Sequence, residues 1–305
     1  MRPELRQKLQ RLLRGRVRFD VPLARYTSFR IGGPADAFIE PQTVAELQVL
    51  VSFLHREAVP FFVLGGGTNI LVSDKGVRGV VIRLGGGFNY VRWGAEEETV
   101  QVRVGAAYPL GRFVRDAVRK GYGGVEFAEG IPGSIGGGVL MNAGAFGGEL
   151  GRVVEKVIGI SWRGNCGCLA REELGFAYRH TALPVGFIVT EIQLCLWREP
   201  QARLRMAMEQ ARQSRFQTQP HGYPNAGSIF KNPPGAYAGR LIEAAGLKGL
   251  TVGRARVSEK HANFIVNTGG ASATEVRQLV EQVRQLVWEK TQVWLEPEIR
   301  FVGEW

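Results

Sequence analysis

The segment Asn225–Pro233, with the sequence NAGSIFKNP, places a hydroxyl, an ammonium and an amide side chain within five positions, at Ser228, Lys231 and Asn232. A positioned hydroxyl with a charged neighbour can transfer a proton to a reacting carbon, which is general acid–base chemistry. Asparagine, glycine, serine and proline are also turn formers, each for its own steric reason. The segment alone therefore fits either a structural turn or a catalytic site.

A second segment, FFVLGGGTNILVSD, is typical of phosphate binding. Gly65–Gly67 follow a predicted strand and precede Thr68 and Asn69. Consecutive amide N–H groups without a Cβ in the way form a concavity that suits a diphosphate. Neither the dinucleotide pattern G-x-G-x-x-G nor the pattern G-x-x-x-x-G-K-[ST] fits, so a phosphate site of another kind is expected. A glycine-rich hairpin turn is the alternative.

A third segment, GIPGSIGGGVLMNAGAFGGE, covers residues 130–149 and is again rich in glycine and small residues. Such a chain has little room for side chains, so we expect it to lie against a flat or extended ligand. Ser134 and Asn142 could reach polar atoms of that ligand. An irregular buried loop would have the same composition.

Charged side chains of two further segments complete the candidate site. Arg179 lies in FAYRHTALP, where its planar guanidinium could bind a carboxylate through two hydrogen bonds. Glu296 and Glu298 alternate with apolar residues in LEPEIRFVG, so a strand would place both carboxylates on one face. A surface cation and a solvent-facing edge strand are the simpler interpretations of these segments.

The elements that must position these residues are mixed in type. A capping box from Thr43 to Glu46 predicts a helix, and Gly121 is expected to end another. Short apolar runs such as PFFVL, GVVIRL and TVQVRV predict strands, and VWLEPEIRFVG predicts a final strand. A polar helix after Pro200 suggests a domain boundary. Because helices and strands do not alternate strictly, the pattern favours an α+β fold.

Composition excludes several classes of protein. The 305 residues are 45% hydrophobic and 22% charged, and 41 of them are glycine. The net charge of +11 is spread among interleaved acids, which fits small anionic substrates better than nucleic acid. Cys166 and Cys168 lack a second pair for zinc, and the four histidines are scattered, so we expect no metal site. No leader or membrane-length apolar run is present, which predicts a cytoplasmic protein with no membrane contact.

Taken together, the motifs GGGTNIL, GIPGSIGGGVLMNAGAFGGE, YRHT, NAGSIFKNP, VSEKHANFIVN and EPEIR resemble those of the UDP-N-acetylenolpyruvoylglucosamine reductase family over nearly the whole chain, from YTSFRIGGPADAFIEP onward. The resemblance implies an NADPH-dependent reduction of UDP-N-acetylglucosamine enolpyruvate to UDP-N-acetylmuramate in peptidoglycan synthesis, with FAD as cofactor. No inserted loop lies between Tyr178 and Ser228. The chain therefore looks like the shorter subclass, which lacks a substrate-closing tyrosine loop.

The resemblance also implies roles for individual residues. Ser228 would donate the proton, and Arg179 and Glu298 would polarise the substrate carboxylate and stabilise the intermediate. The expected FAD contacts are Leu64, Gly65, Gly66, Gly67, Thr68, Asn69, Ile131, Ser134, Gly137, Gly138, Asn142 and Gly144. The expected UDP-sugar contacts are Tyr178, Asn225, Lys231, Asn232, Arg240 and His261.

The implied fold is the vanillyl-alcohol-oxidase or PCMH-type FAD-binding fold in two subdomains, with a smaller α+β substrate domain. We expect the first subdomain at residues 1–80 and the second at 81–200, to which a C-terminal strand at 293–305 returns. The substrate domain is expected at 201–292. No obligate protein partner is expected. The alternatives are an FAD-dependent sugar or alcohol oxidase and a non-catalytic UDP-sugar-binding protein.

Overall fold

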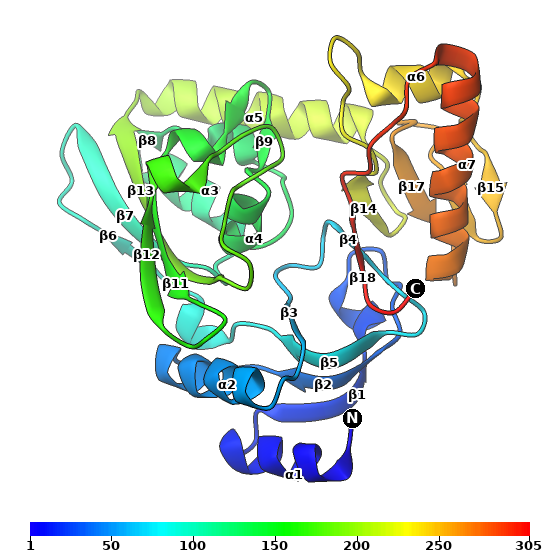
Figure 1. Cartoon of the computed structure of the whole chain (residues 1–305). Helices are drawn as coiled ribbons and strands as arrows, with labels where there is room; N and C mark the ends of the chain where they lie inside the picture. Colours follow the sequence, from blue (N-terminus) through cyan, green and yellow to red (C-terminus); the bar gives the residue numbers. More distant parts are fainter. The chain divides into compact units, whose positions relative to one another are not determined.

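The computed structural model describes residues 1–305, which are divided between two units (Figure 1). Unit 1 consists of Met1–Phe19, Ala37–Gly66 and Gly79–Ser214, and unit 2 of Asp20–Asp36, Gly67–Arg78 and Arg215–Trp305. The chain passes from one unit to the other within strands β1 (Val17–Pro22), β2 (Pro34–Ile39) and β5 (Val77–Ile82), between Gly66 and Gly67, and within helix α5 (Gln201–Thr218). Each unit is therefore built from segments that are far apart in the sequence.

Helices begin and end where local chemistry predicts. The Thr43 hydroxyl accepts a hydrogen bond of 3.1 Å from the Glu46 amide at the start of α2, and Gly121 ends α3 with a φ of 80°. The glycine stop is thus confirmed, whereas only the Thr43 half of the expected capping box forms, because the Glu46 carboxylate accepts from the Gln42 amide at 2.6 Å instead of from the Thr43 amide. The helices are α1 (Pro3–Leu12), α2 (Val44–Arg56), α3 (Leu110–Lys120), α4 (Ile135–Leu140), α5 (Gln201–Thr218), α6 (Ala238–Ala244) and α7 (Ala273–Thr291).

Unit 1 contains an antiparallel sheet with the strand order β12-β11-β13-β7-β6, and β8 also pairs with β13. These strands are β6 (Val91–Trp93), β7 (Thr99–Gly105), β8 (Tyr122–Gly123), β11 (Val154–Ile160), β12 (Cys166–Ala170) and β13 (Ile188–Arg198). Buried residues of β7, β11 and β13 share one core with residues of α3 and α4, including Phe113 and Ile135. That core fixes the glycine-rich segment that includes α4.

Unit 1 has a second hydrophobic core, in which leucines of α1 and α2 pack with Val80 and Ile82 of β5. Strand β3 (Phe61–Val63) pairs in parallel with β5, in a sheet with the order β1-β2-β5-β3. A short hairpin, β9 (Gly144–Ala145) with β10 (Gly148–Glu149), follows α4. The turn after β3 carries Gly65 and Gly66.

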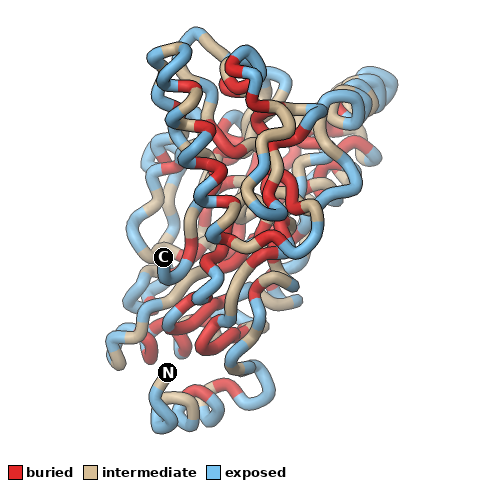
Figure 2. The backbone as a smooth tube through the Cα atoms, turned by 90° about the vertical axis from the view of Figure 1, so that its right-hand side faces the viewer, coloured by how far each residue is buried: buried red, intermediate tan, exposed pale blue.

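Unit 2 contains the sheet β14-β17-β16-β15 and the helices α6 and α7. Its strands are β14 (Asn225–Ser228), β15 (Thr251–Val252), β16 (Ala255–Val257) and β17 (Phe264–Asn267). Helix α7 runs along this sheet (Figure 1) and buries Val276, Leu279, Val280 and Val283. Figure 2 shows buried residues alternating with exposed ones along the helices, as expected for amphipathic elements.

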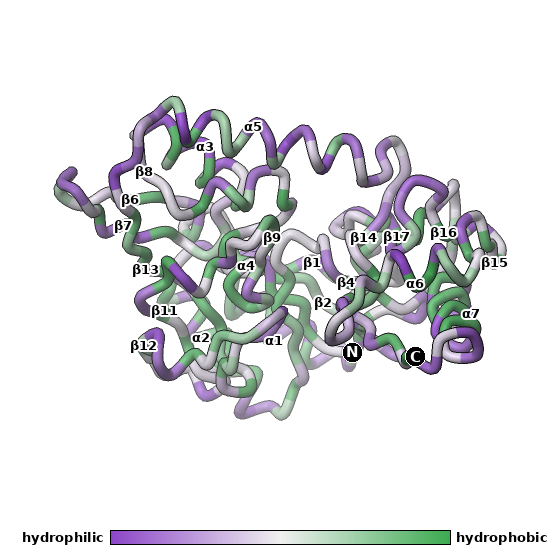
Figure 3. Tube along the Cα trace, turned by 90° about the horizontal axis from the view of Figure 1, so that it is seen from above, coloured by the Kyte–Doolittle hydropathy of each residue, from purple (hydrophilic) through white to green (hydrophobic).

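Helix α5 matches the polar helix that the sequence predicts after Pro200. It buries only Leu204 and Ala211, and Figure 3 shows hydrophilic residues recurring along its length. No helix of the protein combines the length and the apolar character needed to cross a membrane.

The end of the chain differs from expectation. Strand β18 covers only Arg300–Val302 and pairs in parallel with β4 (Ile70–Val72), rather than with residues 81–200. Residues 293–299 are irregular, because Pro297 cannot donate to a ladder and makes only an isolated bridge to Phe230. The expected division into three domains remains a prediction.

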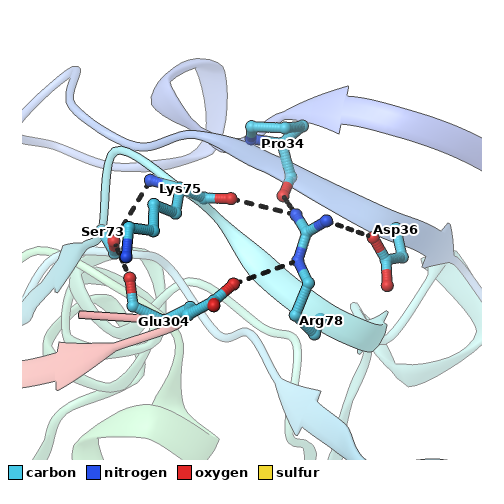
Figure 4. Close-up of polar contacts among 6 residues, drawn as sticks. All are labelled: Pro34, Asp36, Ser73, Lys75, Arg78 and Glu304. Carbon is cyan, nitrogen blue, oxygen red and sulfur yellow. Dashed lines mark hydrogen bonds and ion pairs between the residues drawn. The ribbon is translucent and has the colours of Figure 1, made fainter. Parts of the chain in front are cut away.

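Arg78 and Ser73 connect the C-terminal segment to other segments of unit 2 (Figure 4). The Arg78 guanidinium lies 2.8 Å from the Asp36 carboxylate and 4.0 Å from Glu304, and it donates to the carbonyl oxygens of Pro34 and Lys75. The Ser73 hydroxyl donates to the Glu304 carbonyl oxygen. Strand β18 is therefore anchored beyond its own backbone pairing.

Candidate active site

The two glycine-rich segments of the sequence meet inside unit 1. A Cβ at Gly66 would lie 2.5 Å from the Cα of Gly133, and one at Gly65 would lie 3.1 Å from the Ser134 Oγ. Two carbon atoms that are not bonded to each other clash at 2.5 Å, so only glycine, which has no Cβ, allows the backbone to come this close at position 66. The turn that follows β3 and Leu64 thus lies directly against the segment that begins α4.

Backbone hydrogen bonds hold that second segment in place. The amide of Ile135 donates to the Tyr108 carbonyl at 2.8 Å, and the amide of Gly136 donates to Ala106 at 3.0 Å. The Ser134 hydroxyl accepts a hydrogen bond of 3.3 Å from Gly137 and caps α4. Ser134 is therefore fixed at the point where Gly65 approaches.

Not every glycine of the segment leaves room for a ligand. A Cβ at Gly138 would lie 2.9 Å from Leu150 Cδ1, and one at Gly144 would lie 2.7 Å from the Gly148 carbonyl oxygen. At these two positions the protein itself fills the space, whereas we expected a ligand to do so. At Gly137 the contact is an ordinary 3.4 Å to the Ser134 Oγ, and Ile131 is half-buried nearby in the chain.

Arg179 lies at the tip of a tight turn in unit 1. Ala177 and His180 exchange two backbone hydrogen bonds of 3.0 Å, and Arg179 has a φ of +55°. Its Nη1 donates to the Gly144 carbonyl at 2.9 Å, and its Cζ lies 5.3 Å from the ring centre of the exposed Tyr178. The guanidinium is half-buried and oriented by a backbone carbonyl.

The Asn142 side chain is hydrogen-bonded to the turn that carries Arg179. Its Nδ2 donates to the Ala177 carbonyl at 3.0 Å, while its Oδ1 accepts from the Gly151 amide at 2.9 Å. The side chain is buried, at 1% exposure. Both ends of the amide therefore bind backbone, which gives Asn142 a structural task beside the cofactor contact expected from the sequence.

In unit 2 the structure brings Ser228 and Glu298 close along the backbone. The Glu298 amide donates to the carbonyl of Ile229, the residue after Ser228, at 2.7 Å. Ile229 in turn donates to Asn263 at 2.9 Å, and the Asn225 Oδ1 accepts from Gly227 at 3.0 Å. Ser228 and Glu298 are both half-buried. The hydroxyl and the carboxylate thus belong to two segments joined by a direct hydrogen bond.

Lys231 directs its ammonium group to Glu296. Its Nζ lies 2.5 Å from Glu296 Oε1, and its amide donates to the Glu296 carbonyl at 2.9 Å. Glu296 is exposed, so this pair contributes about 0–1 kcal/mol to stability. The two glutamates that we expected on one strand face have separate surroundings.

The remaining predicted substrate residues gather at the start of α6. The Asn232 Oδ1 accepts from the Ala238 amide at 3.0 Å, and the Arg240 Cζ lies 5.1 Å from the Tyr237 ring centre. The His261 Nδ1 accepts from the Asn263 amide at 3.2 Å. Burial lowers the pKa of His261 below its ordinary value, which favours the neutral form of the ring.

Gly67 and Asn69 begin the part of the phosphate-type turn that belongs to unit 2. Gly67 has a φ of +66°, and a Cβ there would lie 1.9 Å from the Tyr26 carbonyl oxygen. The Asn69 Nδ2 donates to the Glu298 carbonyl at 3.2 Å, and the Asn69 carbonyl accepts from Arg300 at 3.1 Å. Thr68 is half-buried between them.

Sequence reasoning missed two residues that shape the site. The Asn263 side chain accepts from the Phe230 amide at 2.9 Å and donates to the Phe230 carbonyl at 2.8 Å. The Ser28 hydroxyl donates to the Asn225 carbonyl at 2.6 Å. Both lie in segments that were noted for their motifs, VSEKHANFIVN and YTSFRIGGPADAFIEP, but nothing local indicated their distant partners.

The turn of unit 1 fits a dinucleotide diphosphate. The amide N–H groups of Gly65 and Gly66 donate to no group of the protein, and both residues are exposed. Adjacent free amides without side chains are what a diphosphate requires. By contrast, no cluster of three or more potential metal ligands occurs.

The two parts of the chain match two family models. Residues 219–302 match the model described as UDP-N-acetylenolpyruvoylglucosamine reductase, C-terminal domain, and residues 35–161 match an FAD binding domain. The expected α+β fold with an FAD-binding domain is confirmed.

Whole-chain comparisons agree. The chain is 48% identical to UDP-N-acetylenolpyruvoylglucosamine reductase 2 of Symbiobacterium thermophilum, over 97% of this chain and 96% of the relative. It is 44% identical to the reductase of Caldanaerobacter subterraneus subsp. tengcongensis, over 97% of both chains. Its structure is similar to the crystal structure of the Thermus caldophilus reductase, with a TM-score of 0.81 and 39% identity, over 94% of this chain and 100% of the other.

Proposed function

The chain belongs to the UDP-N-acetylenolpyruvoylglucosamine reductase family, and from this premise we propose that Ser228 donates the proton that completes its reaction. The protein is an FAD-containing oxidoreductase that uses NADPH to reduce UDP-N-acetylglucosamine enolpyruvate to UDP-N-acetylmuramate for peptidoglycan synthesis. The hydrogen bond from Glu298 to Ile229 supports the proposal most directly, because it holds the carboxylate segment beside the serine.

The protein's own residues would hold the cofactor. The free amides of Gly65 and Gly66 suit the diphosphate, and Ser134 and Gly137 lie directly against that turn. Leu64, Gly67, Thr68, Asn69, Ile131, Gly138, Asn142 and Gly144 are proposed to complete or support the site. When bound there, FAD would supply the hydride chemistry of the reaction, which carries a hydride from NADPH to the terminal carbon of the enol ether.

The substrate then needs a proton at the carbon that bears the carboxylate. Charge that develops on this carboxylate is stabilised by preorganised donors, and the half-buried, oriented guanidinium of Arg179 is suited to this task. Ser228 transfers the proton, and Glu298, together with Arg179, stabilises the enol-like intermediate. Gly227, with a φ of +77°, sets the backbone direction just before the serine.

The UDP-sugar is proposed to contact Tyr178, Asn225, Lys231, Asn232, Arg240 and His261. A net charge of +11 favours such an anionic small molecule. We also propose that the enzyme works in the cytoplasm and that, through peptidoglycan, it supports cell shape and division. The FAD binding domain and the reductase relatives separate the chain from the oxidase and binding-protein alternatives.

The test is Ser228→Ala, studied by anaerobic stopped-flow spectroscopy. We expect NADPH to reduce the flavin at the wild-type rate, while reoxidation by UDP-N-acetylglucosamine enolpyruvate slows by about 10²–10⁴-fold, because proton transfer is lost. Substrate-induced changes in the flavin spectrum serve as the control that the variant still binds substrate. Two intact half-reactions in the variant would show that Ser228 is not the proton donor.

A further inference from the structure

We propose that Ser28 is a positioning residue that joins the Gly67–Asn69 turn to the segment that carries Ser228. The inference rests on the proposed function, because it concerns how the cofactor turn and the catalytic residues keep their register. Ser28 lies in YTSFRIGGPADAFIEP, a motif to which the proposed function assigns no role.

Ser28 is hydrogen-bonded both to the Gly67–Asn69 turn and to the strand that carries Ser228. Its amide donates to the Gly67 carbonyl at 2.9 Å, and its hydroxyl donates to the Asn225 carbonyl at 2.6 Å, although Asn225 is 197 positions away in the sequence. Asn225 begins β14, which ends at Ser228. A single half-buried serine therefore bridges the turn and the catalytic strand.

The residues beside Ser28 hold it rigidly. The Thr27 hydroxyl donates to the Ile31 carbonyl at 2.9 Å and accepts from the Ile31 amide at 3.2 Å. Phe29 is fully buried in the core of unit 2, and its carbonyl accepts from the Asn267 Nδ2 at 3.0 Å. Ser28 thus sits between two anchored neighbours, which makes its hydroxyl a fixed donor rather than a mobile surface group.

The other end of the same turn is bonded to the second catalytic segment. The Asn69 Nδ2 donates to the Glu298 carbonyl, and Arg300 donates to the Asn69 carbonyl. The turn Gly67–Asn69 is therefore tied to the Ser228 strand through Ser28 and to Glu298 through Asn69. A small displacement at the turn would be transmitted to both catalytic groups.

Three variants test this inference. Ser28→Ala removes the hydroxyl, Ser28→Thr keeps it, and Thr268→Val removes a comparable bond of 2.9 Å to the Arg254 carbonyl elsewhere in unit 2. The measurements are flavin reduction by NADPH, flavin reoxidation by the enolpyruvyl substrate, the FAD dissociation constant of the apoprotein by fluorescence, and the melting temperature.

For Ser28→Ala we expect reoxidation to slow about ten-fold and the FAD dissociation constant to rise a few-fold, while reduction by NADPH is unchanged, because misplaced groups lose rate in the step that they serve. Ser28→Thr should restore both values, and Thr268→Val should match wild type.

Normal reoxidation in Ser28→Ala would overturn the inference. So would equal slowing of both half-reactions together with a lower melting temperature, since that pattern indicates a merely structural role. If wild-type flavin were not reoxidised by this substrate, the proposed function would fail, and the FAD measurement would still test Ser28.

Discussion

At the scale of single residues, the position of Arg179 matters as much as its charge. Its left-handed backbone, its half-burial and its bond to the Gly144 carbonyl direct a planar fork rather than a flexible point charge. We therefore expect Arg179→Lys to lower kcat/KM by about 10²-fold, as for loss of a preorganised donor. Arg119→Lys is the matched control, because Arg119 makes only an exposed pair with Asp116 and should retain near-normal kcat/KM. Near-normal activity of Arg179→Lys would remove Arg179 from the substrate carboxylate.

His261 supplies a prediction on pH. Because burial lowers its pKa, the folded protein takes up a proton on this ring less readily than the unfolded chain does. The free energy of unfolding should therefore fall as pH drops below about 6.5, the ordinary value for histidine. Melting curves between pH 7.5 and 5.5 should show a smaller loss for His261→Gln than for wild type. Identical slopes would show that His261 is not the group responsible.

The sequence predicted which segments carry the chemistry, but it could not predict the partners of their side chains. Lys231 binds Glu296 across 65 positions, and Asn142 binds Ala177 across 35. Such pairs depend on tertiary packing, and no local pattern records them. For the same reason Ser28 and Asn263 escaped notice, since each is an ordinary polar residue until its distant partner is known.

At the scale of elements, the close packing of the turn after β3 against Gly133 defines the cofactor side of unit 1. We expect Gly66→Ala to lower the FAD content of the purified protein strongly, because the new Cβ would meet backbone at 2.5 Å and shift the free amides. The FAD content is measured as the ratio of the flavin absorbance at about 450 nm to the protein absorbance at about 280 nm. Gly111→Ala in α3 is the control, since its Cβ would meet only the end of the Arg115 side chain at 3.4 Å. Equal FAD content in both variants would contradict the role of the turn.

The sequence predicted the ends of helices correctly where each end depends only on neighbouring residues in the chain. The Thr43 cap and the Gly121 stop were readable because each needs only its own turn of helix. The final strand was predicted too long, because its N-terminal half is held by bridges to Phe230 and Lys231 rather than by a continuous ladder. Glycine was likewise ambiguous, since Gly66 is required by a nearby backbone and Gly138 by a leucine side chain.

At the scale of the whole molecule, the sequence indicated an α+β protein with an FAD-binding part but not its discontinuous units. Unit 2 draws on three separated segments of the chain. Long-range contacts assign the short segments Asp20–Asp36 and Gly67–Arg78 to the same unit as the C-terminal segment. Ser28 and Phe29 are hydrogen-bonded to Asn225 and Asn267, and β4 pairs with β18.

Arg78 is the side chain that makes this arrangement testable. We expect Arg78→Ala to lower the melting temperature by several degrees, because a nearly buried Asp36 carboxylate loses a partner at 2.8 Å and three other contacts are lost with it (Figure 4). Arg203→Ala, which breaks only an exposed pair with Glu199, should change it by less than about 1 °C. Differential scanning calorimetry distinguishes the two, and an equal effect of both variants would mean that Arg78 does not stabilise the C-terminal segment.

The parallel pair of β4 and β18 has a consequence for how the protein is made. Residues 70–72 leave the ribosome long before residues 300–302 are translated, so β4 must wait without its partner while most of the chain is synthesised. During that interval its buried apolar side chains are exposed to chaperones and to neighbouring nascent chains. Translation speed and chaperone supply should therefore influence the fraction of chains in which unit 2 folds correctly more than the fraction in which unit 1 does.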